Sequence, residues 1–494
     1  MPQRVRLTPV EMELRRRGRR RLLLLVVVLA ALVIYFLWRL NPNRPADYDA
    51  IEEHFKYGSI GSELANGVPY WILKALPSLF PDKLPGPGYA SLGFVEEEGR
   101  DLPIGFSKRR NFIERAWLNC GVCHTGTVRD SPGAPPRIYL GMPANTMDLQ
   151  ALIRFLIECA HDERFAPDRM MAEIEAISDL NLVERLIYRY FAIPQTRNAL
   201  LETGRIVGFF DRQPASWGPG RVDTFNPYKV VQFSFPMKKL PDREIIGVSD
   251  LPSIWQQRKK VGMNLHWDGN NDSVEERNKS AALGAGVTPT TIDIARIKRI
   301  EDWLWDLEPP AYPYDINASK AALGKPLYER YCADCHGKDG RDFEGEQVGE
   351  VVAIGEIGTD PHRLDSYTPA LSANQNTLYA GYPWRFSHFK KTNGYANMPL
   401  DGLWLRAPYL HNGSVPTVRD LLNQPSQRPQ VFYRGYDVFD KTKLGFVADV
   451  TAEGNRHFFR YDTRLAGNRN GGHLYGTQLS PEEKDALVEY LKQF

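Results

Sequence analysis

The sequence predicts a mainly α fold, built from two similar units with long irregular loops and preceded by one hydrophobic helix. Three observations lead to this fold class. The pentapeptide Cys-x-x-Cys-His occurs twice, at residues 120–124 and 332–336. Apolar residues recur at helical spacing in several segments, including those beside the two pentapeptides. The 40 glycines and 36 prolines favour a loop-rich arrangement of these helices.

The repeated pentapeptide is the attachment signature of c-type haem. The two thiols form thioether bonds to one porphyrin, and the next residue, His124 or His336, becomes the proximal iron ligand. The cysteines predicted to hold the two haems are Cys120, Cys123, Cys332 and Cys335. Zinc sites and redox pairs also use Cys-x-x-Cys, but a histidine directly after both copies argues against them. The sequence therefore predicts two covalently bound haems.

Residues 1–40 are predicted to form a basic cytoplasmic tail and a transmembrane anchor. Six arginines between Arg15 and Arg21 precede an unbroken apolar run over residues 22–38. This run is at the short end for a spanning helix, and the arginines favour the cytoplasmic side. A cleaved signal peptide is the alternative, but no small-residue cleavage site follows Trp38. We expect a single pass through the cytoplasmic membrane of a bacterium, with the body in the periplasm.

Residues 41–310 are predicted to form the N-terminal haem domain, beginning with a segment that wraps around it. Apolar spacing predicts amphipathic helices over residues 147–161 and 170–192. The first of these helices places the fifth cysteine, Cys159, on a core face, where a buried thiol acts as a small apolar group. A long irregular stretch over residues 204–262 is expected to cover the haem.

Residues 316–494 are predicted to form a C-terminal cytochrome c domain. A helix over residues 291–307 is ended by two prolines, which mark the boundary between the domains. A second helix over residues 318–331 runs into the second pentapeptide. Ser480, Pro481 and Glu483 supply the N-cap, first-turn proline and capping-box glutamate of a terminal helix. A helix before the haem motif and a terminal helix crossing it are what a cytochrome c domain needs.

The sixth ligand of each iron decides between electron transfer and binding of a small molecule. For the second haem, Met398 and His473 are equally good candidates on local sequence alone. For the first haem no partner stands out; the candidates are Met142, Met147, Met237, Met263 and His266. An open coordination position would leave no sequence signature, so the missing partner favours a reactive first haem. The alternative is a sixth ligand that the local sequence does not reveal.

Several stretches resemble the di-haem proteins related to rubber oxygenase A, a branch of the bacterial di-haem cytochrome c peroxidase superfamily. The matching stretches are residues 57–61, 88–94, 118–127, 265–271, 405–416 and 472–476. The resemblance implies that the C-terminal haem is bis-histidine, with His473 as the far ligand. It implies that Trp267 relays electrons between the haems, although simple core packing also explains a tryptophan. It also makes calcium between the domains a candidate further cofactor.

The sequence departs from the peroxidases near the reactive iron. Where they carry a glutamine and then a glutamate, this chain has Arg277 and then Ala285. Glu275 and Glu276 are the nearest substitutes for the proton-moving glutamate, but we expect both on a solvated helix face. Rubber, an insoluble extracellular polymer, is a poor substrate for a membrane-anchored protein. The departure counts against ordinary peroxidase activity.

The sequence thus predicts a periplasmic, membrane-anchored di-haem c-type cytochrome. We expect a peroxidase- or oxygenase-like oxidoreductase whose N-terminal haem reacts with O2 or peroxide. The C-terminal haem would exchange electrons with a periplasmic or membrane partner. The alternative is an electron-transfer cytochrome with two six-coordinate haems and no catalytic activity. The net charge of +2 gives no indication of a nucleic-acid partner.

Overall fold

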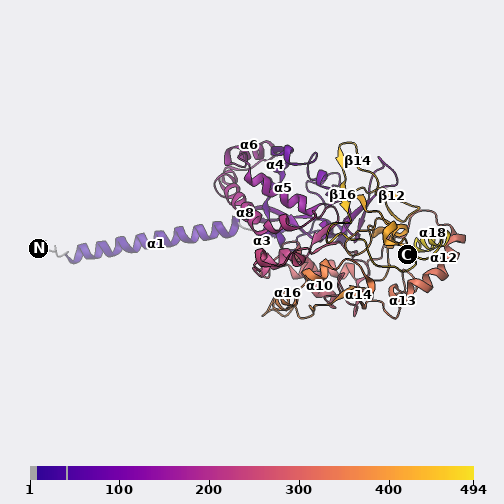
Figure 1. Ribbon diagram of the computed structural model, residues 1–494. Helices are drawn as coiled ribbons and strands as arrows, with labels where there is room; N and C mark the ends of the chain where they lie inside the picture. Colours follow the sequence, from indigo (N-terminus) through magenta and orange to yellow (C-terminus); the bar gives the residue numbers. More distant parts are fainter. Residues whose placement is uncertain (1–7, 41–42) are drawn as a thin grey trace.

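The computed structural model describes residues 8–40 and 43–494, with side chains for residues 8–35 and 43–494. Within these residues helices hold more of the chain than strands, as predicted. Figure 1 shows that α1 (Pro9–Leu40) projects from the body. The helices near its base are α4 (Tyr70–Leu79), α5 (Leu149–His161), α6 (Pro167–Ile177) and α8 (Ile193–Ile206). The helices at the opposite end, beside the C-terminus, are α12 (Ala318–Tyr331), α13 (Ala333–His336) and α18 (Pro481–Leu491). The second pentapeptide, which includes α13, therefore lies at this end of the body.

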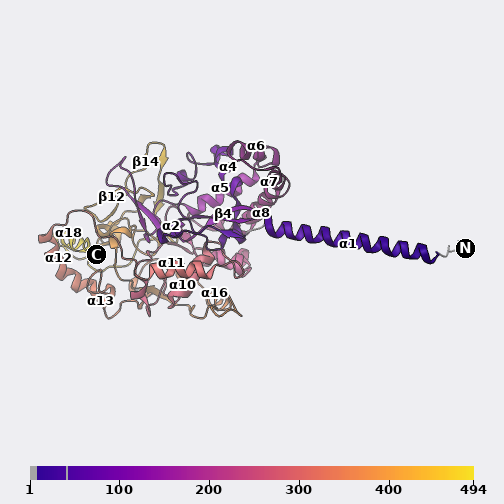
Figure 2. The ribbon, with the colours of Figure 1, turned by 180° about the vertical axis from the view of Figure 1, so that it is seen from behind.

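Helix α1 (Pro9–Leu40) contains the apolar run predicted to span a membrane. It stands clear of the body in both ribbon views (Figures 1 and 2), and its large apolar side chains from Leu22 to Ile34 are 46–66% exposed. No helix in the described part of the chain is long and apolar enough to cross a membrane. The end of the predicted span, residues 36–38, lies beyond the described side chains. The predicted transmembrane pass is therefore not confirmed.

A four-stranded antiparallel sheet leads into the first pentapeptide. Its strand order is β1-β3-β4-β2. The strands are β1 (Arg44–Pro45), β3 (Phe106–Asn111), β4 (Ile113–Leu118) and β2 (Val68–Pro69). Phe106 pairs with Leu118 at the end of the central hairpin. The sheet thus fixes the chain two residues before Cys120.

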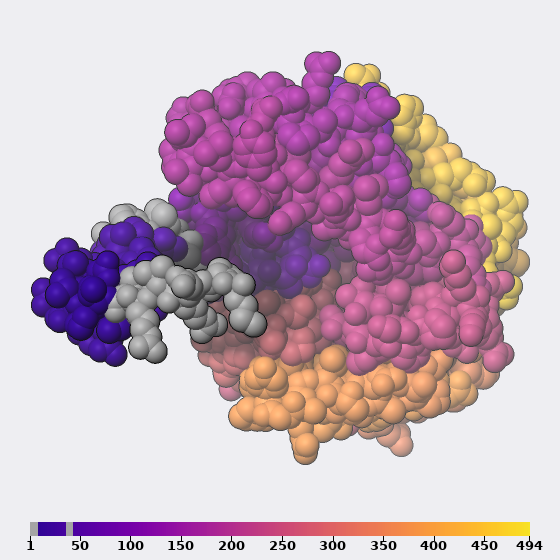
Figure 3. Space-filling view, turned by 90° about the vertical axis from the view of Figure 1, so that its left-hand side faces the viewer, coloured from indigo at the N-terminus to yellow at the C-terminus, as the bar shows by residue number. Residues whose placement is uncertain are grey.

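A helical layer packs beside this sheet over a shared apolar core. Its helices are α4 (Tyr70–Leu79), α5 (Leu149–His161), α6 (Pro167–Ile177) and α8 (Ile193–Ile206). Helix α5 confirms the helix predicted near residues 147–161, and Cys159 on it is fully buried in the core. In Figure 3 the helical region between residues 149 and 206 bulges over a recessed surface near the base of α1.

The single helix predicted over residues 170–192 is wrong. Helix α6 ends at Ile177, and α7 (Leu182–Ile187) begins afresh after four residues of loop. Asn181 and Glu184 form a reciprocal capping box at the start of α7. This cap satisfies free N–H groups at the start of a new helix, so the break between α6 and α7 is real. The apolar spacing in the sequence continues across the break and hides it.

The stretch predicted to be irregular over residues 204–262 contains regular structure. Strands β7 (Arg221–Asp223) and β8 (Val248–Asp250) pair antiparallel, and α9 (Asp242–Ile245) lies between them in sequence. These elements are three or four residues long, too short for periodicity to reveal them. Helix α11 (Ile294–Leu304) confirms the helix predicted after this stretch.

Helices α12 (Ala318–Tyr331) and α18 (Pro481–Leu491) cross closely and hold the second pentapeptide, as predicted. A Cβ atom on Gly324 of α12 would lie 2.1 Å from the carbonyl oxygen of Ala486, so only glycine allows this approach. The Tyr328 ring packs edge-on against Phe494. Its hydroxyl donates to the Gly337 carbonyl at 2.7 Å, directly after the pentapeptide.

Short elements connect these layers. The remaining α-helices are α2 (Ile51–Tyr57), α3 (Ser62–Asn66), α10 (Val274–Gly284), α13 (Ala333–His336), α14 (Ile354–Ile357), α15 (His362–Ser366), α16 (Pro369–Gln375) and α17 (Val418–Leu421). The remaining strands are β5 (Thr125–Val128), β6 (Arg137–Leu140), β9 (Val351–Ala353), β10 (Gly394–Ala396), β11 (Val431–Arg434), β12 (Phe439–Asp440), β13 (Gly445–Phe446), β14 (Ala452–Glu453), β15 (Arg456–His457) and β16 (Phe459–Asp462).

Buried ion pairs join the two halves of the body. Arg129 donates to Asp437 at 2.6 Å and Arg434 donates to Asp250 at 2.5 Å. All four side chains are at least nine-tenths buried. Removing one partner of such a pair leaves an uncompensated charge, so these contacts hold the halves in one arrangement. The domain limits at residues 310 and 316 stay a prediction.

Candidate haem sites

The first pentapeptide is fixed by its preceding asparagine. A 3-10 turn over residues 120–122 follows strand β4. The Asn119 side-chain oxygen accepts from the Gly121 N–H at 2.9 Å, and its amide donates to the Gly58 carbonyl at 2.9 Å. Because Asn119 is fully buried, these bonds lock the turn that presents Cys120 and Cys123 together.

His124 is oriented as a proximal iron ligand. Its Nδ1 lies 3.0 Å from the carbonyl oxygen of Pro252. A carbonyl only accepts, so Nδ1 carries the hydrogen and Nε2 keeps a free lone pair for a metal. Burial, and then the nearby Arg277 charge, lower the pKa of His124 to about 4. The ring is therefore neutral at physiological pH, the form that binds iron.

His336 repeats this arrangement at the second pentapeptide. Its Nδ1 lies 2.7 Å from the carbonyl oxygen of Met398, and burial lowers the pKa of the ring. Nε2, on the opposite side of the ring from Nδ1, would then be the atom that holds an iron. Met398 therefore lies behind the proximal ring, which argues against its sulfur as the sixth ligand.

His473 lies where it could hold, together with His336, one iron between the two rings. Its ring centre is 6.3 Å from that of His336, and the ring planes differ by 33°. An imidazole nitrogen lies about 2 Å from a bound transition metal, and the ring centre about 1 Å further, so two rings sharing one metal stand roughly 6 Å apart. Burial, and then His336, lower the pKa of His473 to about 3. The pair fits an iron between two neutral imidazoles.

The cysteines fit thioether attachment better than a metal cluster. None of the five forms a disulfide. Burial raises the pKa of Cys120 to about 11 and that of Cys123 and Cys332 to about 12. Such thiols are protonated at neutral pH when no group is bound to them. In the part of the chain described, no group of three or more His, Cys, Asp or Glu residues is placed to hold a metal ion.

Trp267 lies between the segments that hold the two proximal histidines. Its indole N–H donates to the Asp250 carbonyl at 2.7 Å, and its own carbonyl accepts from the Ala396 N–H at 2.9 Å. Asp250 ends β8 and precedes Pro252 by two residues; Ala396 ends β10 and precedes Met398 by two residues. The predicted relay residue thus bridges the two acceptor segments.

The far side of His124 differs from that of His336. Of the proposed ligands, Met142, Met147 and Met237 are buried in the apolar core. His266 pairs its Nδ1 with Asn270 at 2.6 Å and stacks on Phe389. No ring of a described residue faces His124 at the distance that separates His336 and His473. The sequence-based distinction between two unlike sites therefore stays consistent with the geometry.

Glu275 and Glu276 were both expected on a solvated helix face, and this expectation is wrong for Glu276. Glu275 is exposed and pairs with Lys279 on the same helix. Glu276 is buried, and its carboxylate accepts from the His388 ring at 2.7 Å and from the Ser387 N–H at 2.8 Å. The loop over residues 387–389 covers this face of α10, which no local pattern in the helix could reveal.

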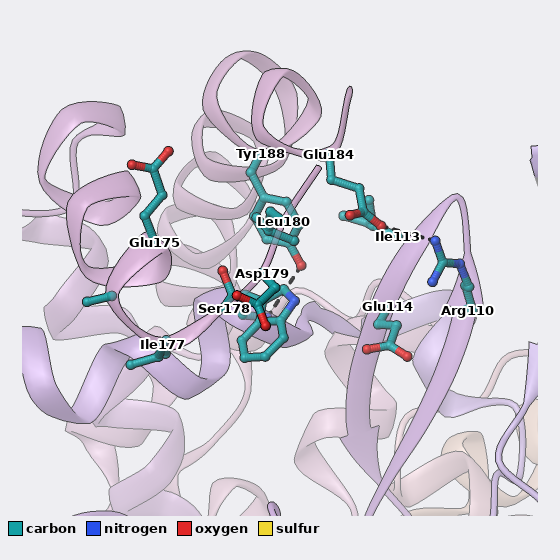
Figure 4. Close-up of a pocket in the computed structure, with 12 residues that line it drawn as sticks. Arg110, Ile113, Glu114, Glu175, Ile177, Ser178, Asp179, Leu180, Glu184 and Tyr188 are labelled. Carbon is teal, nitrogen blue, oxygen red and sulfur yellow. Dashed lines mark hydrogen bonds and ion pairs between the residues drawn. The ribbon is translucent and has the colours of Figure 1, made fainter. Parts of the chain in front are cut away.

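A surface pocket lies apart from these sites. Figure 4 shows its walls, formed by the hairpin of β3 and β4 and by the loop between α6 and α7. Its volume is about 500 Å³, and none of the predicted haem residues lines it. Its acidic lining includes Glu114, Glu175 and Asp179, while Arg110 pairs with Glu184 at 3.0 Å. The pocket does not belong to either candidate haem site.

Comparison with known proteins finds a short family match in the second half of the chain and two longer matches to uncharacterized proteins. The family described as RoxA-like, cytochrome c-like matches residues 394–433. Uncharacterized protein y4iM of Sinorhizobium fredii (strain NBRC 101917 / NGR234) is 31% identical over 282 residues, covering 50% of this chain and 64% of that protein, which is less than two thirds of its length. Uncharacterized protein y4iJ of the same strain is 25% identical over 550 residues, covering 86% of this chain and 88% of that protein.

These similarities support a coarse identification. A cytochrome c-like segment implies at least one c-type haem and a haem-related redox function. It also indicates a location outside the cytoplasm. In this segment the chain is similar to the RoxA-like cytochromes c.

Proposed function

We propose that this chain is an exported di-haem c-type cytochrome with an electron-transfer site at His336 and His473 and a reactive site at His124. When bound, the two haems supply redox chemistry at iron, including reaction with O2 or peroxide. The carrying observation is the contrast between the sites: His336 faces His473 across 6.3 Å, and no described ring faces His124 in this way. Two strong ligands suit electron transfer, whereas an open position suits small-ligand binding.

Arg277 is the residue that best suits a reactive first site. It is partly buried, and its charge lowers the pKa of both His124 and His266, after burial itself. Its guanidinium donates to the Asn278 side chain at 3.1 Å, and Glu301 is the carboxylate that acts on its charge. A cation near His124 would favour an anionic ligand such as the peroxide anion at this site. This is the position where the sequence departs from the peroxidases.

Trp267 is proposed to relay electrons between the two sites. Its hydrogen bonds to Asp250 and Ala396 support this role, because they attach it to both acceptor segments at once. The electron partner is proposed to be a periplasmic or membrane-bound carrier. Replacing Trp267 by Phe should slow electron transfer between the haems while leaving both absorption spectra unchanged. Stopped-flow reduction monitored at the two haems measures this rate.

The first experiment is absorption and EPR spectroscopy of the full-length holoprotein, oxidised and reduced, with and without carbon monoxide. We expect one low-spin haem that does not bind carbon monoxide and one haem that does. In His473→Met the low-spin signal should change, whereas His457→Ala, at an exposed histidine, should leave it intact. Two low-spin haems that both exclude carbon monoxide would support the electron-carrier alternative. His266 would then be the first ligand candidate to replace.

Membrane attachment through α1 is part of the proposal. The projecting helix and its exposed apolar side chains support it, because burying such side chains in the membrane removes apolar surface from water. Cell fractionation tests it: the full chain should sediment with membranes after a high-salt wash, and a chain lacking residues 1–40 behind a cleavable export signal should not. Recovery of both forms in the soluble periplasmic fraction would refute the attachment.

A further inference from the structure

We infer that Arg428 positions His473 opposite His336, by holding the backbone of the loop that carries this histidine. The inference rests on the proposed pairing of these two histidines about one iron. Arg428 is a positioning residue in this role, because its side chain contacts backbone atoms of the loop, while the imidazole of His473 is the ligand.

The Arg428 guanidinium uses every hydrogen-bond donor that it has. Arginine carries five N–H donors in a rigid, planar fork. The acceptors are the backbone carbonyls of Asn470 (2.6 Å), Gly472 (2.9 Å), His473 (3.1 Å), Leu421 (3.0 Å) and Asn423 (3.0 Å). The residue is 2% exposed, so water cannot replace these bonds.

These five bonds connect two separate segments. Three acceptors lie in the ligand loop over residues 470–473, and two lie at the end of α17 and just beyond it. Arg428 therefore joins the loop to a helical segment of the body. A fork of this shape holds the carbonyls in fixed relative positions, which a point charge does not.

The ligand loop needs such support because its own conformation is unfavourable. It forms no helix or strand, and His473 has a φ of +49°, in the left-handed region that residues with a Cβ rarely adopt. The one backbone bond made by His473 goes from its N–H to the Ile357 carbonyl at 2.9 Å. A Cβ atom on Gly472 would lie 2.4 Å from that same oxygen, so the loop is pressed against the Ile357 turn.

Arg428 also brings a positive charge close to the second site. None of its five hydrogen bonds goes to a carboxylate, and a guanidinium is charged at neutral pH. A buried cation near a redox centre favours the reduced state, because reduction removes positive charge. Arg428 is therefore expected to raise the reduction potential of the second haem as well as to fix its ligand.

Two substitutions separate geometry from charge. Arg428→Lys keeps the charge but has three donors on a flexible stem, and Arg428→Met removes both. The matched control is Arg464→Lys, at an exposed arginine paired with Asp462. Each is made in the full-length holoprotein, with haem content and far-UV circular dichroism as checks on folding.

We expect both Arg428 variants to lose low-spin signal from the second haem and to gain carbon monoxide binding there. The first haem should be unchanged, and millimolar imidazole should restore the low-spin spectrum. Arg428→Met alone should lower the potential of whatever low-spin fraction is left. If Arg428→Met does not fold, Arg428→Lys decides the question.

An unchanged low-spin signal in a folded Arg428 variant would overturn the inference. A parallel His473→Met variant separates this result from failure of the proposed function. If His473→Met leaves the second haem spectrum untouched, the pairing with His336 is wrong. If that variant alters the spectrum and the Arg428 variants do not, the histidine pairing stands and the positioning role of Arg428 is refuted.

Discussion

Replacing Gly324 by alanine should force apart the helices that frame the second haem motif. The added Cβ would lie 2.1 Å from the Ala486 carbonyl oxygen and 2.9 Å from the Tyr490 Cβ. The first contact is with backbone, so no side-chain rotation relieves it, and α12 must move by about 1 Å relative to α18. Overpacking of this kind costs about 3 kcal/mol, and the better helix propensity of alanine returns about 1 kcal/mol. We expect a net loss of about 2 kcal/mol.

Gly284→Ala is the matched control for this substitution. Gly284 also lies in a helix, α10, but nothing lies within 4 Å of an added Cβ there. It should gain stability by up to about 1 kcal/mol from helix propensity alone. Urea unfolding of the two holoprotein variants, followed by circular dichroism, measures the difference, expected near 3 kcal/mol. Equal stabilities would show that α12 and α18 do not meet as closely as described.

Three further predictions concern other parts of the body. Asp437→Asn should cost about 2 kcal/mol in thermal unfolding, because buried Arg129 then keeps Glu453 as its only carboxylate partner. Glu276 raises the pKa of His388, so this pair stabilises the fold below the usual histidine pKa of about 6.5 and loses its effect as the pH rises through the raised value. His388 is half exposed, so His388→Gln should remove no more than about 0.5 kcal/mol of the pH-dependent part of the unfolding free energy. The measurement is thermal unfolding of both proteins at about pH 5.5 and about pH 9, on either side of the histidine titration. Cys159→Ala should cost about 1 kcal/mol and leave the number of haems per chain, counted by mass spectrometry, unchanged.

Local sequence signals predicted the helices that frame each motif. The cap at Ser480 and the apolar spacing after it define α18 because both act within one or two helical turns. The break before Asn181 was missed because the apolar period continues in phase across it. Burial of Glu276 was missed because the covering loop lies more than one hundred residues away in the chain. Local patterns thus predicted the elements, and contacts between distant segments decided which side chains are buried.

The contribution of Met398 shows why ligand assignments were harder than motifs. On sequence alone its sulfur competed with His473, since either group can bind haem iron. In the structure the Met398 backbone carbonyl, which carries no residue-specific signature, orients His336 from behind. Pro252 does the same for His124. A search for ligand-type side chains cannot find backbone acceptors. The carbonyl groups that orient His124 and His336 therefore could not be predicted from the sequence.

The position of the family match shows which of the two proposed haem sites the similarity covers. The matched residues 394–433 include Ala396, which binds the Trp267 backbone, and Met398, which orients His336. They also include Arg428, which holds the loop of His473. One short segment therefore contains contacts to both proposed ligands of the second site and to the proposed relay. The family match thus covers residues that would hold the second haem, and it does not include His124. The proposed reaction at His124 would depend on a separate set of residues around Arg277, so its substrate must be sought from the chemistry of that site.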